Sequence, residues 1–189
     1  GRVIDPLSQM GASIKSEEGM LPISIKHSLL KDNFSYELPV ASAQVKSSIL
    51  LAGLAAGVSV KVIEPIQTRD HTERMLKYFG ADIEIISENS KNIIQLYSGS
   101  KLKPLNYKVV GDISSAAFLI VGALITQSPE LKIFNVGMNP SRTGVLTALK
   151  KMGANIKATN QRVECGEPCA DLVVRPSHLK GVELSGDII

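Results

Sequence analysis

Three short segments decide the fold: Met10-Gly11-Ala12-Ser13-Ile14, Phe79-Gly80-Ala81-Asp82-Ile83 and Met152-Gly153-Ala154-Asn155-Ile156. In each of them an apolar residue precedes Gly-Ala, and a polar residue and an isoleucine follow. The segments recur about 70 residues apart, which is longer than the usual coil of a solenoid and long enough for a supersecondary module. The sequence therefore predicts one module that is repeated along the chain.

The middle copy predicts two helices. Residues 42–56 carry apolar residues three and four positions apart and stop at Gly57, a pattern typical of a buried helix that ends at a glycine. Thr68 is the expected N-cap of the second helix, and Gly80 is its expected end. The Gly-Ala pair thus marks the end of a helix.

The same copy predicts four strands, because β-branched or alternating residues fill four short stretches: 34–40, 58–63, 82–86 and 92–97. With the two helices between them, the order of elements in one module is β-α-β-α-β-β. The sequence thus predicts a mixed α/β (α+β) fold.

Parts of two further copies flank this one. A second copy is expected over residues 107–175, and the end of an earlier copy over residues 5–26. One and a half to two and a half modules are therefore present. The stretch 101–111 contains a proline and leads into the later copy, so we expect the chain to cross between two domains there, with 1–108 in the first domain and 109–189 in the second.

Composition excludes several classes of protein. Of the 189 residues 44% are apolar and 21% are charged, as in a globular chain. A net charge of +3, no Trp, and only four Tyr and four Phe argue against a nucleic-acid-binding face. No apolar run approaches the roughly 20 residues of a membrane span, and the first residues do not form a secretion signal. We expect a cytoplasmic protein with no membrane or nucleic-acid partner.

A metal site is not expected. Cys165, Cys169 and His178 are candidate ligands, but a structural zinc site needs a fourth ligand and closer pairing of the cysteines. Residues 166–168, which separate the two cysteines, are typical of a turn between strands. We interpret both cysteines as ordinary thiols.

The first candidate site is the start of the helix at 42–56. Ser42 and Gln44 are polar residues in the first turn of an otherwise apolar helix. The free N–H groups and partial positive charge of a helix N-terminus, together with a hydroxyl and an amide, suit a phosphate group. The alternative is that Ser42 only caps the helix, while Gln44 and Lys46 point to water.

The second candidate site is centred on Arg69, expected at the start of the next helix. A cation is unfavourable at that position, which suggests that Arg69 serves an anion with its planar fork of donors. The alternative is an exposed arginine balanced by Asp70 and Glu73. His71 is a candidate acid or base, although a histidine in a charged first turn is more often a surface residue.

Four motifs together carry a resemblance: Ser42-Ala-Gln-Val-Lys-Ser-Ser48, Thr68-Arg-Asp-His-Thr-Glu-Arg-Met-Leu76, Gly111-Asp-Ile-Ser-Ser-Ala-Ala-Phe118 and Met138-Asn-Pro-Ser-Arg-Thr-Gly144. The chain resembles, over its whole length, the middle of the 5-enolpyruvylshikimate-3-phosphate synthase family, in particular class II. It corresponds to somewhat under half of a full member. The resemblance implies an inside-out barrel of six modules, three in each of two domains, with the crossing near Val110-Gly111.

The resemblance also implies an activity and a set of site residues. The expected reaction transfers an enolpyruvyl group from phosphoenolpyruvate to the 5-hydroxyl of shikimate 3-phosphate and releases phosphate, without metal or organic cofactor, in a monomeric full-length enzyme. Ser42, Ala43 and Gln44 match the segment that binds shikimate 3-phosphate. Gln44 also lies where the family places it near phosphoenolpyruvate, and Arg69 matches a further substrate-binding position.

No catalytic residue of the family is expected in this chain. The N-terminal lysine segment, the Asn-Ala-Gly-Thr loop with its arginine, the Asp-Glu-Tyr-Pro segment and the Lys-Glu-Ser-Asp-Arg segment have no counterpart here. We therefore predict that the chain alone does not turn over substrate. Two alternatives are the related UDP-N-acetylglucosamine enolpyruvyl transferase and a non-catalytic binding or scaffold module of the same fold.

Overall fold

A computed structural model describes residues 1–88, 91–127 and 129–185. The chain forms two compact units, Gly1–Leu105 and Asn106–Ile189. Assignment of 1–108 and 109–189 to the two domains of a larger enzyme stays a prediction. No helix in the described ranges is both long enough and apolar enough to cross a bilayer.

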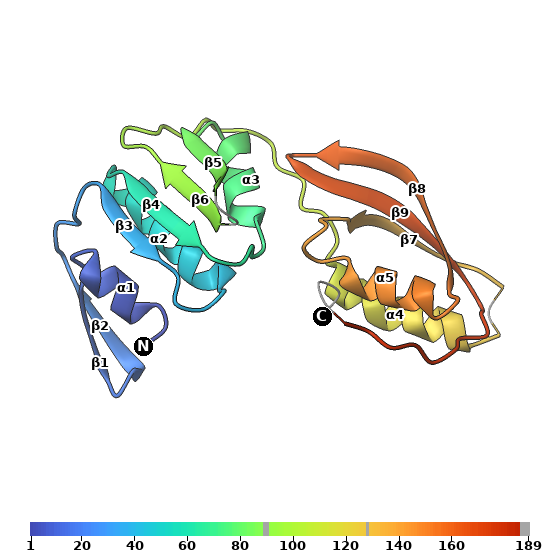
Figure 1. Cartoon of the computed structure of the whole chain (residues 1–189). Coiled ribbons are helices and arrows are strands. Elements are labelled where there is room, and N and C mark those ends of the chain that lie inside the picture. The colour runs from blue at the N-terminus through green and yellow to red at the C-terminus, as the bar shows by residue number, and fades with distance from the viewer. Residues whose placement is uncertain (89–90, 128, 186–189) are drawn as a thin grey trace. The chain divides into compact units, whose positions relative to one another are not determined.

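The first unit contains three helices and six strands within its described residues (Figure 1): α1 (Ile4–Gln9), β1 (Ser13–Glu17), β2 (Met20–Lys26), β3 (Phe34–Glu37), α2 (Ala43–Ala56), β4 (Val60–Glu64), α3 (His71–Tyr78), β5 (Ile83–Glu88) and β6 (Lys91–Leu96). Strands β1 and β2 form an antiparallel hairpin. The other four form a sheet in the order β3-β4-β6-β5, in which only β3 and β4 are parallel. This order matches the predicted β-α-β-α-β-β module, preceded by the helix and two strands of an earlier copy.

Helix α2 has the ends that its sequence predicts. The Ser42 hydroxyl accepts a hydrogen bond from the Val45 amide at 3.5 Å, and Gly57 takes the left-handed conformation, with φ 68°. In the body of the helix, Gly53 lies against strand β4, and a Cβ atom there would meet Val60 Cγ1 at 2.7 Å. Helix and strand therefore approach each other closely because residue 53 has no side chain.

Helix α3 begins later than predicted. Its N-cap is Asp70, and the predicted cap Thr68 instead donates its hydroxyl to the Glu64 carboxylate at the end of β4. The expected start was wrong because this partner, which lies before Thr68 in the chain, draws its hydroxyl away from the helix. The predicted end is confirmed, since Gly80 follows the last turn with φ 89°.

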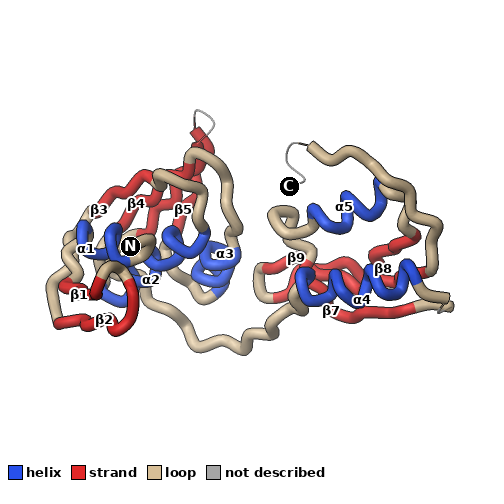
Figure 2. The backbone as a smooth tube through the Cα atoms, turned by 90° about the horizontal axis from the view of Figure 1, so that it is seen from below, coloured by secondary structure: helices blue, strands red, loops and turns tan. Residues whose placement is uncertain are grey.

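The core of the first unit lies on one face of its sheet. Val60 and Val62 alternate on β4 and are fully buried, as are Ile49 and Leu50 of α2. Leu76 of α3 joins the same cluster. Helices α2 and α3 thus cover the same side of the strands, as the view from below shows (Figure 2).

The second unit repeats this arrangement with two helices and three strands among its described residues: α4 (Ile113–Ile125), β7 (Leu131–Gly137), α5 (Gly144–Lys151), β8 (Asn155–Glu164) and β9 (Glu167–Arg175). The sheet order is β7-β9-β8, all antiparallel. Where the first unit has β3, a single parallel bridge joins Gly111 to Val136. The mixed α/β fold and the repeated module are confirmed, while the closed barrel stays an expectation from the resemblance.

The core and the hairpin of this unit follow the same rules. Ile120 of α4, Leu149 of α5 and Leu172 of β9 belong to one buried cluster on one face of the sheet. The turn between β8 and β9 consists of Cys165 and Gly166, whose φ values of 52° and 84° suit a tight hairpin. The turn predicted at 166–168 is therefore displaced by one residue, and Pro168 lies inside β9.

Candidate functional site

Ser42, Ala43 and Gln44 lie together at the start of α2. Ser42 and Ala43 are half-buried and Gln44 is exposed. The simpler interpretation is confirmed for Ser42, which caps the helix, and for Gln44, which reaches solvent. Neither finding excludes a ligand, because the amides of the first turn face outward from a helix N-terminus whether or not a side chain caps one of them.

A cavity of about 210 Å³ opens beside this helix start. The Ser42 side of α2 forms one wall, and Arg2 and Asp5 contribute the charged groups of its lining. The remaining lining is mainly apolar and comes from α1, β3, the segment that leads into α2, and α2 itself: Pro6, Tyr36, Leu38, Pro39, Val40, Ala41 and Val45. Of the four predicted site residues, Ser42 lines this cavity, and Ala43, Gln44 and Arg69 do not.

Lys46 corrects the sequence analysis. Its side chain is 0% exposed, and its ammonium lies 3.0 Å from Glu64 Oε1 and 2.6 Å from Glu73 Oε1. Both carboxylates are 2% exposed. The interpretation that Lys46 points to water is wrong, because two acids on β4 and α3 face it across the core. We call Lys46, Glu64 and Glu73 the buried triad.

The buried triad carries more acid than base. Burial raises the pKa of Glu73, although the ammonium of Lys46 opposes this shift. One oxygen of Glu73, Oε2, is buried and has no hydrogen-bond partner in the described part of the chain. Glu64 also accepts the hydroxyl of Thr68. One feature of the sequence could have indicated that Glu73 is buried. Glu73 lies three residues before the apolar Leu76, so both side chains share one face of the helix.

Arg69 is exposed, in the loop between β4 and α3. Its side chain makes no hydrogen bond or ion pair with any described residue. The expected balance with Asp70 and Glu73 is wrong, because Asp70 pairs with Arg74 at 2.8 Å and Glu73 pairs with Lys46. This arginine is therefore available to an anion.

His71 is exposed at the first position of α3, which is consistent with the surface interpretation.

The two candidate segments belong to one unit and are tied together. The buried triad joins α2 to both ends of the Arg69 loop, and the hydroxyls of Ser47 and Thr72 share a hydrogen bond of 2.7 Å. The structure thus anchors the helix start and the Arg69 segment through neighbouring side chains. The N-terminus of α2 and the unpaired guanidinium of Arg69 are therefore two groups of one unit that can each attract an anion.

In the second unit, the corresponding helix start and arginine pair with each other. Asp112 caps α4 by accepting the Ser114 amide at 3.0 Å, and Arg142 donates to Asp112 Oδ1 at 3.0 Å and to Ser114 Oγ at 2.7 Å. The hydrogen bond from the Ser114 amide, followed by the contacts with Arg142, lowers the pKa of Asp112. This helix start is already neutralised.

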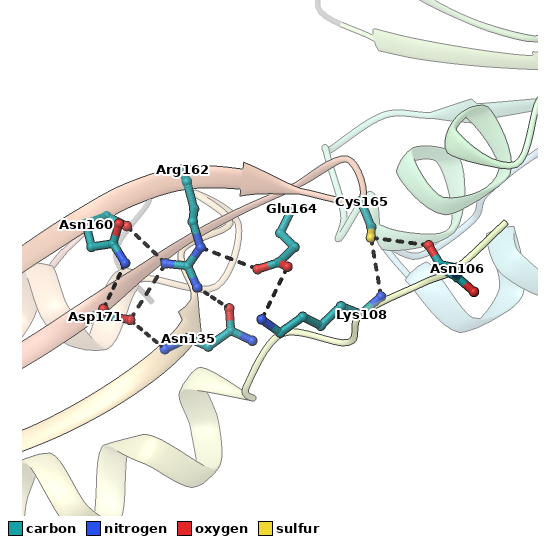
Figure 3. Close-up of polar contacts among 8 residues, drawn as sticks. All are labelled: Asn106, Lys108, Asn135, Asn160, Arg162, Glu164, Cys165 and Asp171. Carbon is teal, nitrogen blue, oxygen red and sulfur yellow. Dashed lines mark hydrogen bonds and ion pairs between the residues drawn. The ribbon is translucent and has the colours of Figure 1, made fainter.

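A further polar cluster in the second unit surrounds Arg162 (Figure 3). Its guanidinium contacts Glu164 at 3.3 Å, Asp171 at 3.7 Å and the Asn135 side chain at 2.7 Å. Asn135 and Asn160 are left-handed, with φ 55° and 48°, where β7 and β8 change register against β9. Lys108 also pairs with Glu164, at 3.3 Å, so two cations face two carboxylates beside the irregular parts of these strands.

Cys165, Cys169 and His178 are the candidate metal ligands of the sequence. Within the described residues no three His, Cys, Asp or Glu side chains gather closely enough to hold a metal ion. Burial raises the pKa of Cys169, as expected for an ordinary buried thiol.

Comparison with known proteins gives one consistent result. The family model described as "EPSP synthase (3-phosphoshikimate 1-carboxyvinyltransferase)" matches residues 1–187. Curated proteins named 3-phosphoshikimate 1-carboxyvinyltransferase are 49% identical in Petrotoga mobilis and 47% identical in Zymomonas mobilis, and both align with 100% of this chain. The solved EPSP synthase of Acinetobacter baumannii is 48% identical over 99% of the chain, with a TM-score of 0.83. The chain spans 43%, 42% and 42% of these three relatives.

Proposed function

The chain belongs to the EPSP synthase family, and from this premise we propose that it serves the transfer of an enolpyruvyl group from phosphoenolpyruvate to the 5-hydroxyl of shikimate 3-phosphate. The hydroxyl adds to phosphoenolpyruvate and phosphate is then eliminated, so the reaction balances without an oxidant or reductant. No metal or organic cofactor enters the proposed reaction. A monomeric full-length enzyme that works in the cytoplasm is part of the same proposal.

We propose that Ser42, Ala43, Gln44 and Arg69 bind shikimate 3-phosphate. The unpaired guanidinium of Arg69, on a loop anchored to the start of α2, is the observation that supports this best. A doubly charged phosphate suits both the helix N-terminus and the planar fork of an arginine. The hydroxyl and amide of Ser42 and Gln44 add hydrogen-bonding groups beside it.

The chain alone is not expected to complete the reaction. The segments that the resemblance assigns to acid–base chemistry and to most of the phosphoenolpyruvate clamp have no counterpart in these 189 residues. Measurable phosphate release from the purified chain, abolished in Arg69→Ala, would contradict this expectation.

The two alternatives have weaker support. The relatives compared above are named 3-phosphoshikimate 1-carboxyvinyltransferase, which does not favour the UDP-N-acetylglucosamine enzyme. A scaffold that binds RNA would need many basic groups and would bind with steeply salt-dependent affinity. The small net charge of +3 does not favour such a role.

Titration calorimetry of the chain with shikimate 3-phosphate tests the proposal. We expect unphosphorylated shikimate, and the Arg69→Ala variant with the phosphorylated ligand, each to bind at least ~10-fold more weakly, because a charged hydrogen bond contributes about 1.5–3 kcal/mol. Arg142→Ala is the matched control, since it removes an arginine from the other unit. Equal affinity for shikimate and its phosphate would contradict the assignment of these residues.

A further inference from the structure

The buried triad is the feature of the first unit that the proposed chemistry leaves unused. Lys46, Glu64 and Glu73 are each at most 2% exposed and come from α2, the last residue of β4 and the first turn of α3. Removing three charged groups from water is costly, and replacement by apolar residues of similar volume is often neutral or stabilising. Stability alone is therefore a weak explanation for the triad.

The location of the buried triad suggests a different role. Lys46 lies one helical turn after Ser42, and its amide donates to the Ser42 carbonyl at 3.1 Å. Glu64 accepts the hydroxyl of Thr68, the residue next to Arg69. Glu73 lies on the far side of the Arg69 loop. The three charges thus hold the start of α2 and both ends of that loop.

We propose that Lys46, Glu64 and Glu73 are positioning residues that hold the Arg69 loop against the start of α2, so that the anion site exists before the anion arrives. They do not touch the ligand themselves in this proposal. We take the anion to be the phosphate of shikimate 3-phosphate, and this choice rests on the function proposed above.

The second unit shows that the module does not need these ions in order to fold. The shared spacing of Arg69 and Arg142 from the Gly-Ala pairs, and the helix caps Ser42 and Asp112, align the two copies. The residues that correspond to the buried triad are Ala116, Gly137 and Leu146. Ala116 and Leu146 are buried in an apolar cluster. The copy that neutralises its own arginine therefore has no triad, and the copy with an unpaired arginine has one.

The test uses a variant that removes the charges and keeps the core. In Lys46→Met/Glu64→Leu/Glu73→Leu, apolar side chains of similar length replace all three groups, so the unit is expected to stay folded. Lys61→Met is the matched control, because Lys61 is exposed on β4. Folding of each variant is checked by circular dichroism and by amide exchange of β4 and β6.

The first readout is the backbone order of the loop from ¹⁵N relaxation, which needs no ligand. We expect the order parameters of residues 66–70 to fall from about 0.85 to below about 0.6 in the triple variant, with those of β4 and β6 unchanged. Unchanged order parameters of 66–70 in a folded triple variant would overturn the proposal. A fall throughout the unit would also count against it, because that result indicates a purely structural role.

The second readout is affinity for shikimate 3-phosphate by calorimetry. Loss of positioning is expected to weaken binding by about 10- to 100-fold in the triple variant, as small displacements of binding groups do, while Lys61→Met binds like the wild type. The variant Glu73→Gln keeps the shape of the glutamate but removes its charge, so we expect it to loosen the loop and to weaken binding by less than the triple variant does.

The two proposals fail in different ways. If the wild-type chain binds no shikimate 3-phosphate while the order parameters of the loop fall in the triple variant, the substrate assignment is wrong and the positioning role stands. If the wild type and the folded triple variant bind equally well, the positioning role is wrong and the substrate assignment stands.

Discussion

The two copies of the module treat the same arginine in opposite ways. Arg142 in the second unit is held by the capping Asp112 and by Ser114. Arg69 in the first unit is held by no described residue, and a serine, not an acid, caps the neighbouring helix. Both arginines precede a short helix and a Gly-Ala pair in the same register. The comparison teaches that one scaffold can either close a helix N-terminus with its own charges or leave it open to a ligand.

The interiors of the two copies differ at the corresponding places. Behind the unpaired arginine lies the buried triad, and behind the paired one lies an apolar cluster with Ala116 and Leu146. The second unit does bury a polar contact elsewhere, between Asn139 and Glu167 at 3.3 Å, in the loop before Arg142. Each copy thus fixes its arginine loop from inside, but only the first does so through a buried lysine.

The largest expected effect comes from removing one member of the buried triad. Lys46→Met leaves two buried carboxylates without their cation, so the free energy of unfolding of the first unit is expected to fall by about 3–5 kcal/mol. Urea denaturation, combined with amide exchange to separate the units, measures this change. Lys61→Met is expected to stay within ~0.5 kcal/mol of the wild type. A similar small loss in Lys46→Met would mean that the triad contributes little.

A smaller and opposite pair of effects is expected at two helix glycines. Gly53→Ala places a Cβ atom 2.7 Å from Val60 Cγ1, so overpacking is expected to cost about 1–3 kcal/mol. No described residue beyond the helix backbone comes within 4 Å of a Cβ atom built on Gly122 of α4, so Gly122→Ala is expected to stabilise the second unit by ~0.5–1 kcal/mol. Thermal unfolding of the two variants checks both signs, and a stabilising Gly53→Ala would disprove the close approach of α2 to β4.

The two copies are also expected to respond oppositely to pH. Burial raises the pKa of Glu73 above its usual 4.5, so its contribution to stability is complete below 4.5 and is lost as the pH rises through the shifted value. The pKa of Asp112 lies below its usual 3.8, so its contribution is present above 3.8 and is lost as the pH falls. Amide exchange measured between pH 3 and pH 8 gives the stability of each unit separately, once the rates are corrected for the intrinsic exchange rate at each pH.

Matched variants assign these pH trends. In the first unit, Glu73→Gln is expected to reduce the loss of stability that occurs as the pH rises. In the second unit, Asp112→Asn is expected to reduce the loss of stability that occurs as the pH falls. If Glu73→Gln leaves the profile of the first unit unchanged, another group causes it.

Local patterns predicted most of the fold. Gly57 and Gly80 end helices as expected, and the alternating stretches form strands. Thr68 and Lys46 were misjudged for one common reason, since each is bound by a carboxylate from another element of the core. Helix and strand periodicity reports which face of an element is apolar, but it cannot report that a lysine and a glutamate on two different elements face each other.

The sequence predicted which residues belong to the candidate site, but not how their side chains are arranged. The helix start at Ser42 and the importance of Arg69 came from their motifs, while the availability of Arg69 depends on Asp70 turning to Arg74 instead. Asp70 pairs with Arg74 and not with Arg69 because Asp70 is the N-cap residue of α3, so that Arg74 lies one helical turn from it.

Nuclear magnetic resonance of the ¹⁵N-labelled chain, titrated with shikimate 3-phosphate, tests the central comparison most directly. The account expects saturable shifts of the amides of residues 42–44 and of 68–70, and no saturable shift of the amides of residues 112–114 or of Arg142. Shifts of equal size at both helix starts, or at the second alone, would contradict the claim that only the first copy is open to an anion.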